Sequence, residues 1–485
     1  MRLIDQEIIQ NMQRFDIPGM AFVLADEGGA IYTKGYGVLE WGSLGEVDST
    51  TRFQIGSISK VFTSLAMMQL QDQGLIRLDA PVTTYLPWFA TKDSTLSDRI
   101  TVHDLLNHTS GLPGRLNTHV IKSTSSERIA AQIKHKLQNV QLVADPGTAY
   151  EYTNMNYDLL QLIIEEVSGL NYPDYMHHRI FQPLGMHQTF FTQDTAGLDQ
   201  NSATGHRYIW GHVRPFHEKL AYATLGSAGV STSAEDLGTY ISFLLSGASA
   251  GGSGDPIIQA SSLRRMHTPS IFDSSIGYGY GWEITAHTIE KKGGLPGFSA
   301  NLIVVPDKSY GFALLANSKQ NITDETNFNI YRILKGEPPR HLAKGDFPAV
   351  SSINRSLLAI SASLILIIVL IWLPASIGWI RKRTSCSLIR PTIAVILFCF
   401  VLNGLLLVSV FYYIYVHIPY LSGASSLHQL TTAPDTVQGL TLLSIVWLGL
   451  SISIACKSIL RVKAYDKSRQ SRPSFHLDNK LGPDG

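Results

Sequence analysis

The pattern of hydrophobic and polar residues changes once along the chain. Up to about residue 340 it alternates between helical and strand periods, whereas after residue 355 it consists of long uncharged runs. The first part predicts a folded domain at residues 1–340, and the second predicts membrane helices between residues 356 and 460. Residues 341–355 are predicted to link the two.

The predicted domain begins with a helix and ends with strands. The opening helix has one apolar face, formed by Ile4, Ile8, Ile9 and Met12. Apolar, β-prone runs at residues 20–26 and 30–40 predict a hairpin that turns at Gly28-Gly29, and a helix is predicted over residues 57–73. Further strand candidates lie at residues 278–286, 300–306 and 309–317, with Gly293-Gly294 and Pro306-Asp307 as turn signals. Strands at both ends of a helical middle predict an α/β (α+β) fold, in which one mostly antiparallel sheet, flanked by helices, pairs its first and last strands.

Three uncharged runs follow the linker. They cover about residues 357–380, 391–416 and 437–456, and each is long enough to cross about 30 Å of hydrocarbon as a helix. Buried helices of a soluble core are rarely uncharged on every face, so we interpret the runs as three transmembrane helices. Residues 461–485 are predicted to form a polar tail.

Lys and Arg are unevenly distributed around these runs. Basic residues cluster after the first run, at residues 381–390, and after the third, from Lys457 onward, whereas residues 417–435 contain none. The positive-inside rule therefore predicts a multi-pass protein of the cell membrane, with a cytoplasmic tail and an extracytoplasmic domain at residues 1–340.

The N-terminal residues conflict with this topology, because residues 1–15 contain no apolar signal-peptide core. Three explanations stay open: an upstream signal peptide absent from this sequence, export of the domain by the first span, or a cytoplasmic domain. We favour the first.

The composition of the chain excludes some classes of function. The mean hydropathy of +0.07, with 45% hydrophobic and 16% charged residues, agrees with a chain that lies partly in lipid. A net charge of +1 leaves no basic surface for a phosphate backbone, so a nucleic-acid partner is not expected. All three cysteines, Cys386, Cys399 and Cys456, follow residue 350, so the predicted domain has neither a disulfide nor a cysteine nucleophile.

Ser57 and Lys60 form the only S-x-x-K sequence in the chain. Three residues are nearly one helical turn, so Lys60 projects beside Ser57 where a strand-like segment passes into a helix. A serine at a helix N-terminus with an amine beside it is a candidate activated nucleophile. The alternative is that Ser57 only caps the helix and Lys60 is solvated.

Two further motifs accompany Ser57. Tyr152 and Asn154 lie on a turn that leads into an amphipathic helix, and Lys291-Lys292-Gly293-Gly294 follows a predicted strand, where its glycines permit close approach of a ligand. Together with residues 105–114, 181–186 and 226–237, this set resembles the serine β-lactamase family of the class C type, which also contains D-alanyl-D-alanine carboxypeptidases and esterases. The resemblance covers about residues 5–335.

The resemblance implies a role for each of these residues. Ser57 is the implied nucleophile, Lys60 and Tyr152 share the work of general base, and Tyr152 later protonates the leaving group. Asn154 is implied to bind the substrate amide, and the backbone N–H groups of Ser57 and Gly294, beside Gly293, form the oxyanion hole. Lys291 is implied to supply positive charge to Tyr152 and to a substrate carboxylate. Two flanking ammonium groups are expected to lower the pKa of the Tyr152 phenol.

The register of the third motif is uncertain by one residue, because Lys292 stands where the family often has Thr or Gly. We choose Lys291 from its distance to Phe298, and on a strand Lys292 points to the opposite face. The bulky Lys292 also casts doubt on β-lactam recognition.

Other candidate sites have little support. Ser249 lies in a G-x-S-x-G sequence, but it follows a helical segment and enters a Gly/Ser-rich loop, which does not suit a nucleophile elbow. The histidines His103, His108, His177 and His178 lack metal-ligand spacing, so neither a metal nor another cofactor is expected. The resemblance makes His108 a residue that stabilises its loop.

The sequence thus predicts a bacterial, membrane-anchored serine hydrolase that acts through an acyl-enzyme on D-alanyl peptides, β-lactams or related amides and esters. Its expected partners are these small substrates and membrane lipid. The alternatives are a penicillin-binding receptor, in which acylation signals through the membrane helices, and a catalytically silent scaffold.

Overall fold

The computed structural model describes residues 1–114, 116, 125–191, 201–209, 212–217, 220–247, 256–273, 276–318, 322–340 and 358–370, with short pieces of the chain beyond. The chain divides into two compact units, Met1–Lys344 and Gly345–Gly485. The predicted linker, residues 341–355, lies outside the described residues.

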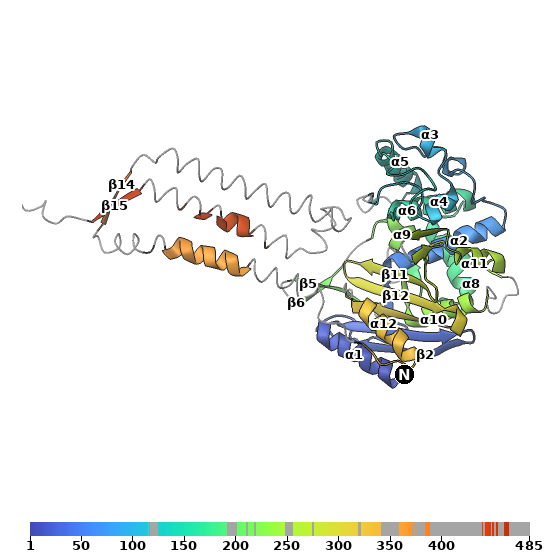
Figure 1. Ribbon diagram of the computed structural model, residues 1–485, viewed down its shortest axis with the longest axis horizontal. Helices are drawn as coiled ribbons and strands as arrows, with labels where there is room; N and C mark the ends of the chain where they lie inside the picture. The colour runs from blue at the N-terminus through green and yellow to red at the C-terminus, as the bar shows by residue number, and fades with distance from the viewer. Residues whose placement is uncertain are drawn as a thin grey trace, which may run out of the picture. The chain divides into compact units, whose positions relative to one another are not determined.

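An eight-stranded antiparallel sheet forms the centre of the first unit (Figure 1). Its strands run in the order β2-β1-β13-β12-β11-β10-β9-β8. They are β1 (Gly19–Asp26), β2 (Gly29–Gly37), β8 (Ile271–Asp273), β9 (Ile276–Tyr278), β10 (Glu283–Ile284), β11 (Ile289–Leu295), β12 (Phe298–Val305) and β13 (Tyr310–Ala316). Strands β1 and β13 pair with Met20 opposite Ala316, so the expected meeting of the first and last strands is confirmed, as is the β1–β2 hairpin.

Strand β1 shows how the sheet is covered on both faces. Met20, Phe22 and Leu24 pack in a cluster with residues of α1 (Arg2–Phe15) and α12 (Ile322–Leu334). The alternating Ala21, Val23 and Ala25 belong to the larger core cluster on the other face, which α10 (Ala234–Leu245) covers. Side chains along a strand point alternately to its two faces, so an almost wholly apolar strand requires helices on both sides.

The remaining helices surround a central helix, α2 (Ser59–Asp72), which is buried on nearly every face. Figure 1 shows α3, α4, α5 and α6 gathered at one end of this unit, away from α1 and α12. The other helices are α3 (Ser94–Ser97), α4 (Val102–Leu106), α5 (Ser126–Leu137), α6 (Asn154–Ser168), α7 (Tyr172–Met176), α8 (Gln182–Leu184), α9 (Leu225–Ala228) and α11 (Ala260–Met266). Short 3-10 turns are η1 (Gly56–Ile58), η2 (Val82–Thr84), η5 (Tyr222–Thr224) and η6 (Pro306–Lys308), and η3 (His177–Phe181) is a π-helical turn.

Two small antiparallel sheets complete the unit. The first has the order β3-β7-β4, from β3 (Arg52–Gln54), β7 (Val230–Ser233) and β4 (Phe190–Phe191). The second pairs β5 (Gly205–Ile209) with β6 (His212–Phe216). Strand β3 leads directly to η1 and α2, so the three-stranded sheet holds the segment that contains Ser57.

The structure corrects three local predictions. Ile9 is 42% exposed, and the buried face of α1 includes Glu7 and Asn11. The Asn11 amide donates to Glu7 Oε1 at 2.8 Å and to Thr326 Oγ1 of α12 at 3.1 Å, so a polar network occupies a surface where only apolar contacts were expected.

The other corrections concern the strands near the site. The run at residues 278–286 is divided between β9 and β10, because Gly281 has a positive φ of 84° that interrupts the pleat. Gly293-Gly294 is not a turn: both glycines lie inside β11, and the chain reverses after Leu295.

The second unit is described only in pieces. They include a helix at residues 358–370 and two strands, β14 (Thr384–Leu388) and β15 (Leu460–Ala464), which pair antiparallel. Among the residues that could be searched, no helix combines the length and the apolar character needed to cross a bilayer. The predicted span at 391–416 lies outside the described residues, and the spans at 357–380 and 437–456 are described only in part.

Candidate active site

Ser57 lies in η1, between β3 and α2. The preceding Gly56 has φ +51°, and a Cβ built on it would lie 2.8 Å from the backbone nitrogen of Gly294. Only glycine fits at this position, because a side chain would be strained at this φ and would collide with the backbone of β11. The turn therefore presents Ser57 at the start of the α2 helical segment, with Gly294 of β11 close by.

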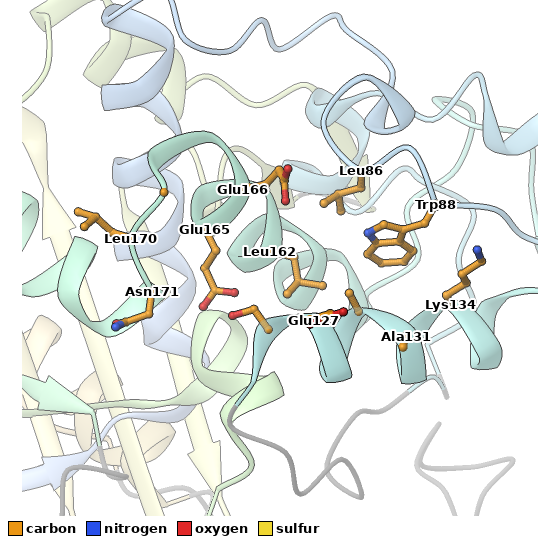
Figure 2. A pocket seen from close by; sticks show the side chains of 13 residues that line it. Leu86, Trp88, Glu127, Ala131, Lys134, Leu162, Glu165, Glu166, Leu170 and Asn171 are labelled. Atoms are coloured by element: carbon orange, nitrogen blue, oxygen red, sulfur yellow. The ribbon is translucent and has the colours of Figure 1, made fainter.

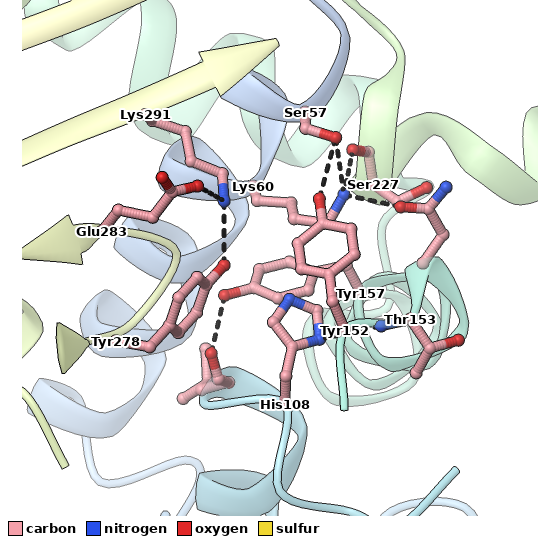
Figure 3. A network of polar contacts seen from close by, with 12 residues as sticks. Ser57, Lys60, His108, Tyr152, Thr153, Tyr157, Ser227, Tyr278, Glu283 and Lys291 are labelled. Carbon is pink, nitrogen blue, oxygen red and sulfur yellow. Dashed lines mark hydrogen bonds and ion pairs between the residues drawn. The ribbon is translucent and has the colours of Figure 1, made fainter. Parts of the chain in front are cut away.

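The Lys60 side chain, one turn further on, is fully buried. Its Nζ lies 3.2 Å from Ser57 Oγ and donates to Asn154 Oδ1 and to the Ser227 carbonyl, both at 2.8 Å (Figure 3). Burial holds the pKa of Lys60 well below its usual value, and the positive charge of Lys291 lowers it further, while Asp158 opposes the shift.

These contacts suit a neutral amine. A neutral amine has two N–H donors and one lone pair, and the two carbonyl oxygens of Asn154 and Ser227 can only accept. Once both donors are used, the lone pair is left for the Ser57 hydroxyl. The geometry thus places a candidate base beside Ser57.

Tyr152 approaches Ser57 from the segment that precedes α6. Its phenol donates a hydrogen bond to Ser57 Oγ at 2.9 Å. Its ring packs against His108, with ring centroids 4.3 Å apart. The His108 Nδ1 accepts from Asn156 Nδ2 at 3.0 Å and from the Thr153 backbone N–H at 3.4 Å, so His108 fixes the turn on which Tyr152 lies.

The pKa of Tyr152 moves opposite to our expectation. Burial of the phenol raises its pKa above 10, although the hydrogen bond with Ser57 opposes the shift. Removal of water from around a phenolate is the largest cause, and the negative charges of Glu283 and Asp158 raise the pKa further. The direction of the shift therefore favours the protonated phenol beside Ser57.

Lys291 enters the site from β11, whereas its neighbour Lys292 is exposed on the opposite face. The Lys291 side chain is 1% exposed, donates to the Tyr278 hydroxyl at 3.0 Å and lies 3.7 Å from Glu283 Oε1 (Figure 3). Burial lowers the pKa of Lys291 to about 8, and Glu283 limits the decrease. Its Nζ is 5.2 Å from the Tyr152 ring centroid, which is within the range of a cation–π contact.

Gly293 and Gly294 allow β11 to lie against the nucleophile turn. A Cβ on Gly293 would come within 1.8 Å of the Ile55 carbonyl oxygen, whereas a Cβ on Gly294 would meet nothing within 4 Å. Gly293 is thus required for the close approach, and Gly294 faces open space beside Ser57. That space is where the resemblance implies that a substrate carbonyl binds.

The structure brings the predicted site residues together, with Lys292 on the exposed face of β11 that Gly294 shares, and it adds three groups that the sequence did not single out as part of the site. Ser227 contributes a backbone carbonyl, which any residue carries, so no side-chain signal could have identified it. Tyr278 and Glu283, the partners of Lys291, come from the divided 278–286 segment. Their polar side chains in an apolar run were the available signal.

The described site does not include the remaining candidates from the sequence. Ser249, Cys399 and Cys456 lie outside the described residues, and Cys386 lies on β14. His177 and His178 are in η3, and His103 contacts the Tyr280 hydroxyl at 2.8 Å. In the described part of the chain, no three His, Cys, Asp or Glu side chains are grouped as metal ligands.

A serine–lysine–tyrosine cluster on an α/β scaffold with an antiparallel sheet defines a β-lactamase-like serine hydrolase fold. The family profile described as Beta-lactamase matches residues 4–336, and the chain belongs to that family.

Individual relatives agree with this assignment. The chain is 29% identical over 322 residues to Protein flp of Staphylococcus aureus, a match that covers 65% of this chain and 62% of the relative. It is 27% identical over 350 residues to Penicillin-binding protein 4 of Amycolatopsis lactamdurans, covering 67% of this chain and 88% of that protein.

Solved structures show the same fold. The octameric penicillin-binding protein homologue from Pyrococcus abyssi matches with a TM-score of 0.61 and 25% identity, over 73% of this chain and 80% of its own. A class C β-lactamase matches with a TM-score of 0.60 and 23% identity, over 70% of this chain and 96% of its own.

Proposed function

We propose that this chain is a membrane-anchored serine hydrolase that acts through a Ser57 acyl-enzyme on D-alanyl peptides, β-lactams or related amides and esters. The observation that carries the proposal is the position of Ser57 Oγ, 3.2 Å from Lys60 Nζ and 2.9 Å from the Tyr152 hydroxyl. One neighbour is shifted toward a neutral amine and the other keeps its phenolic proton. A serine between a base and an acid is equipped for acyl transfer.

The proposed reaction uses these groups in order. The neutral Lys60 amine takes the Ser57 proton while Oγ forms a bond to the substrate carbonyl carbon. The resulting oxyanion is stabilised by the backbone N–H groups of Ser57 and Gly294. Tyr152 gives its proton to the leaving nitrogen or oxygen as the carbonyl–leaving-group bond breaks. The Lys60 ammonium restores the phenol through the polar cluster, and water then hydrolyses the acyl-enzyme.

The substrate range is proposed from the class of relatives rather than from a particular contact. A penicillin-binding protein and a class C β-lactamase are among the proteins similar to this chain. The exposed Lys292, next to Gly293 on β11, can meet a negatively charged substrate but provides no hydroxyl there. We therefore propose a carbonyl substrate with a leaving amide or alkoxide, and leave the choice among peptides, β-lactams and esters to experiment.

Membrane anchoring is supported by the second unit taken by itself. In the helix at residues 358–370, apolar side chains such as Ile360, Leu366 and Leu370 are about half exposed. Exposed apolar side chains in succession are typical of a surface that faces lipid. Strand β14 precedes the second predicted span and pairs with β15, which follows the third, as expected if both lie on one side of the membrane.

Labelling with activity-based probes tests the hydrolase. Membranes containing wild type or Ser57→Ala would be treated with a fluorescent penicillin and with a fluorophosphonate, and release of the label would be followed. We expect labelling that depends on Ser57 and is released over time. Absence of Ser57-dependent labelling by both probes would contradict the proposal, and stable labelling without release would favour the receptor.

The topology has its own test. Protease added to intact cells should cleave within residues 1–340 if this unit is extracytoplasmic, while a tag at the C-terminus should stay protected. Protection of residues 1–340, with cleavage only after lysis, would overturn the assignment.

A further inference from the structure

Buried ionisable side chains outside the active site include Glu165 and His206. Figure 2 shows Glu165 among the side chains that line a pocket between α5 and α6. Its Oε1 accepts hydrogen bonds from the Tyr172 backbone N–H at 3.0 Å and from the Tyr222 hydroxyl at 2.7 Å. Its Oε2 has no donor among the described residues, so a proton can be added there without loss of a bond. His206 differs, because both nitrogens of its ring already have partners.

His206 lies on β5, and none of its surface is exposed. Its Nδ1 is 2.9 Å from the backbone carbonyl oxygen of Asn317, and its Nε2 accepts from the Trp41 backbone N–H at 2.9 Å. A carbonyl oxygen can only accept and a backbone N–H can only donate, so Nδ1 carries the proton and Nε2 the lone pair. The ring is therefore neutral in this arrangement. An imidazolium has two N–H groups and no lone pair, so protonation of His206 breaks its bond with Trp41.

Trp41 lies in the loop of residues 38–46, which follows β2. The base of this loop is held without the imidazole ring, since the Asn317 side chain donates to the Val38 carbonyl at 3.1 Å. The tip carries Trp41, which is 50% exposed, and Leu44, which is 99% exposed. Little packing therefore opposes an opening of the tip once its bond to the ring is lost.

Charged groups face the His206 ring from two elements, namely Glu40 of the loop and His217 after β6. The other segments that contact His206 do so through uncharged residues: Asn317, and Gly297, whose carbonyl oxygen accepts from the His206 backbone N–H at 3.1 Å. Burial lowers the pKa of His206 below its usual 6.5, the Asn317 carbonyl and Glu40 oppose the decrease, and His217 adds to it. The closed loop is thus favoured at neutral pH.

We propose that His206 is a pH-sensitive latch, in which the neutral imidazole holds the tip of the loop of residues 38–46 on β5 and the imidazolium releases it. A proton from solvent binds Nε2 and would face the Trp41 N–H, so the ring and the tip separate. Water or the Glu40 carboxylate then accepts the new N–H, while the base of the loop stays in place. Because the lone pair is needed only in the closed state, the closed state is fully favoured above pH 6.5 and is lost as the pH falls below it. The latch does not depend on the proposed hydrolase activity.

Hydrogen–deuterium exchange of the full chain in nanodiscs tests the latch. Exchange would be followed by mass spectrometry at pH values of about 7.5 and about 5, each corrected for the intrinsic exchange rate at that pH. We expect the peptide that contains Trp41 to lose protection at the lower pH, by up to about tenfold for each pH unit below the usual pKa of histidine. A peptide from β1 should keep its protection, which would exclude global unfolding.

Three variants assign the effect to the ring. In His206→Gln, the amide can accept from Trp41 and donate to Asn317 but does not titrate, so the protection of the loop should be the same at both pH values. His212→Gln replaces an exposed histidine on β6 and is the matched control, which should respond to pH as wild type does. Glu40→Gln removes the charge that favours the imidazolium, so the loss of protection should move to lower pH. Circular dichroism would confirm folding, and if His206→Gln does not fold, the shift in Glu40→Gln decides.

Two results would overturn the proposal. One is protection of the Trp41 peptide that does not change with pH in wild type. The other is a wild-type response to pH in folded His206→Gln or, if that variant does not fold, in Glu40→Gln. Because the readout is amide exchange, a chain that fails to acylate at Ser57 can still open its loop, so the two proposals fail separately.

Discussion

The Tyr152 hydroxyl donates to Ser57 Oγ at 2.9 Å, although 95 residues separate the two along the chain. The same serine oxygen lies 3.2 Å from Lys60 Nζ, which is only three residues away. A local contact and a distant contact thus converge on one atom. The proposed acyl transfer depends on both contacts.

Replacement of Tyr152 by Phe should remove the proton donor while the ring continues to pack on His108. We expect the acylation rate to fall about 10²- to 10⁴-fold, the usual contribution of a positioned acid or base, with little change in thermal stability. Stopped-flow acylation with a chromogenic ester would measure the rate. If the variant acylates like wild type, Tyr152 is not the donor.

The pH dependence of acylation should depend on Lys291. Lys60 must be neutral to act as a base, and its pKa is lowered by burial and by the Lys291 charge, so acylation should rise as the pH rises through this pKa. Lys291→Met removes the positive charge, and the Lys60 pKa should increase. The acid limb of the pH–rate profile should then move to higher pH.

Lys292→Met is the matched control for this experiment, because Lys292 lies on the exposed face of the same strand. The acid limb of the pH–rate profile of Lys292→Met should coincide with that of wild type. In the wild type, the Lys291 ammonium itself loses its proton near pH 8, so the contribution of its charge should disappear above that pH. An identical shift in both variants would refute the assignment of the effect to Lys291.

Asn154→Asp should hold Lys60 in its charged form. The Asn154 Oδ1 is 2.8 Å from Lys60 Nζ, and a carboxylate at that distance favours the ammonium. Acylation at neutral pH should drop at least about tenfold and recover as the pH is raised, since one unit of pKa corresponds to a tenfold change. Asn154→Leu controls for loss of the amide: its activity should also fall, but without recovery at high pH.

Gly293 and Gly294 give a paired test of the close approach between β11 and η1. Gly293→Ala places a Cβ 1.8 Å from the Ile55 carbonyl oxygen, so the strand must move. We expect a loss of about 1–3 kcal/mol in the free energy of unfolding and slower acylation at Ser57. Gly294→Ala has no neighbour within 4 Å and should unfold like wild type. Chemical denaturation of both variants would measure the difference, and equal stabilities would contradict the structure.

The hydrophobic pattern of the sequence predicted those elements whose formation depends on residues close together along the chain. The hairpin of β1 and β2 follows from two apolar runs and a glycine turn, and the structure pairs them as expected. Alternation along β1 places Phe22 and Val23 on opposite faces, as a period of two requires. The same reasoning failed for Ile9, because its burial depends on which face of α1 meets α12, and a polar network with Asn11 occupies that face.

The sequence by itself determined the candidate side chains of the site, since recognisable local motifs contain Ser57, Lys60, Tyr152, Asn154 and Lys291. The tertiary structure decided how they are arranged. It turned Lys291 inward and left Lys292 exposed, and it placed the Ser227 carbonyl on Lys60. It also reversed the expected shift of the Tyr152 pKa. Spacing along a chain specifies neighbours within a turn or a strand, whereas desolvation and distant contacts arise only when separate elements pack around the same atoms.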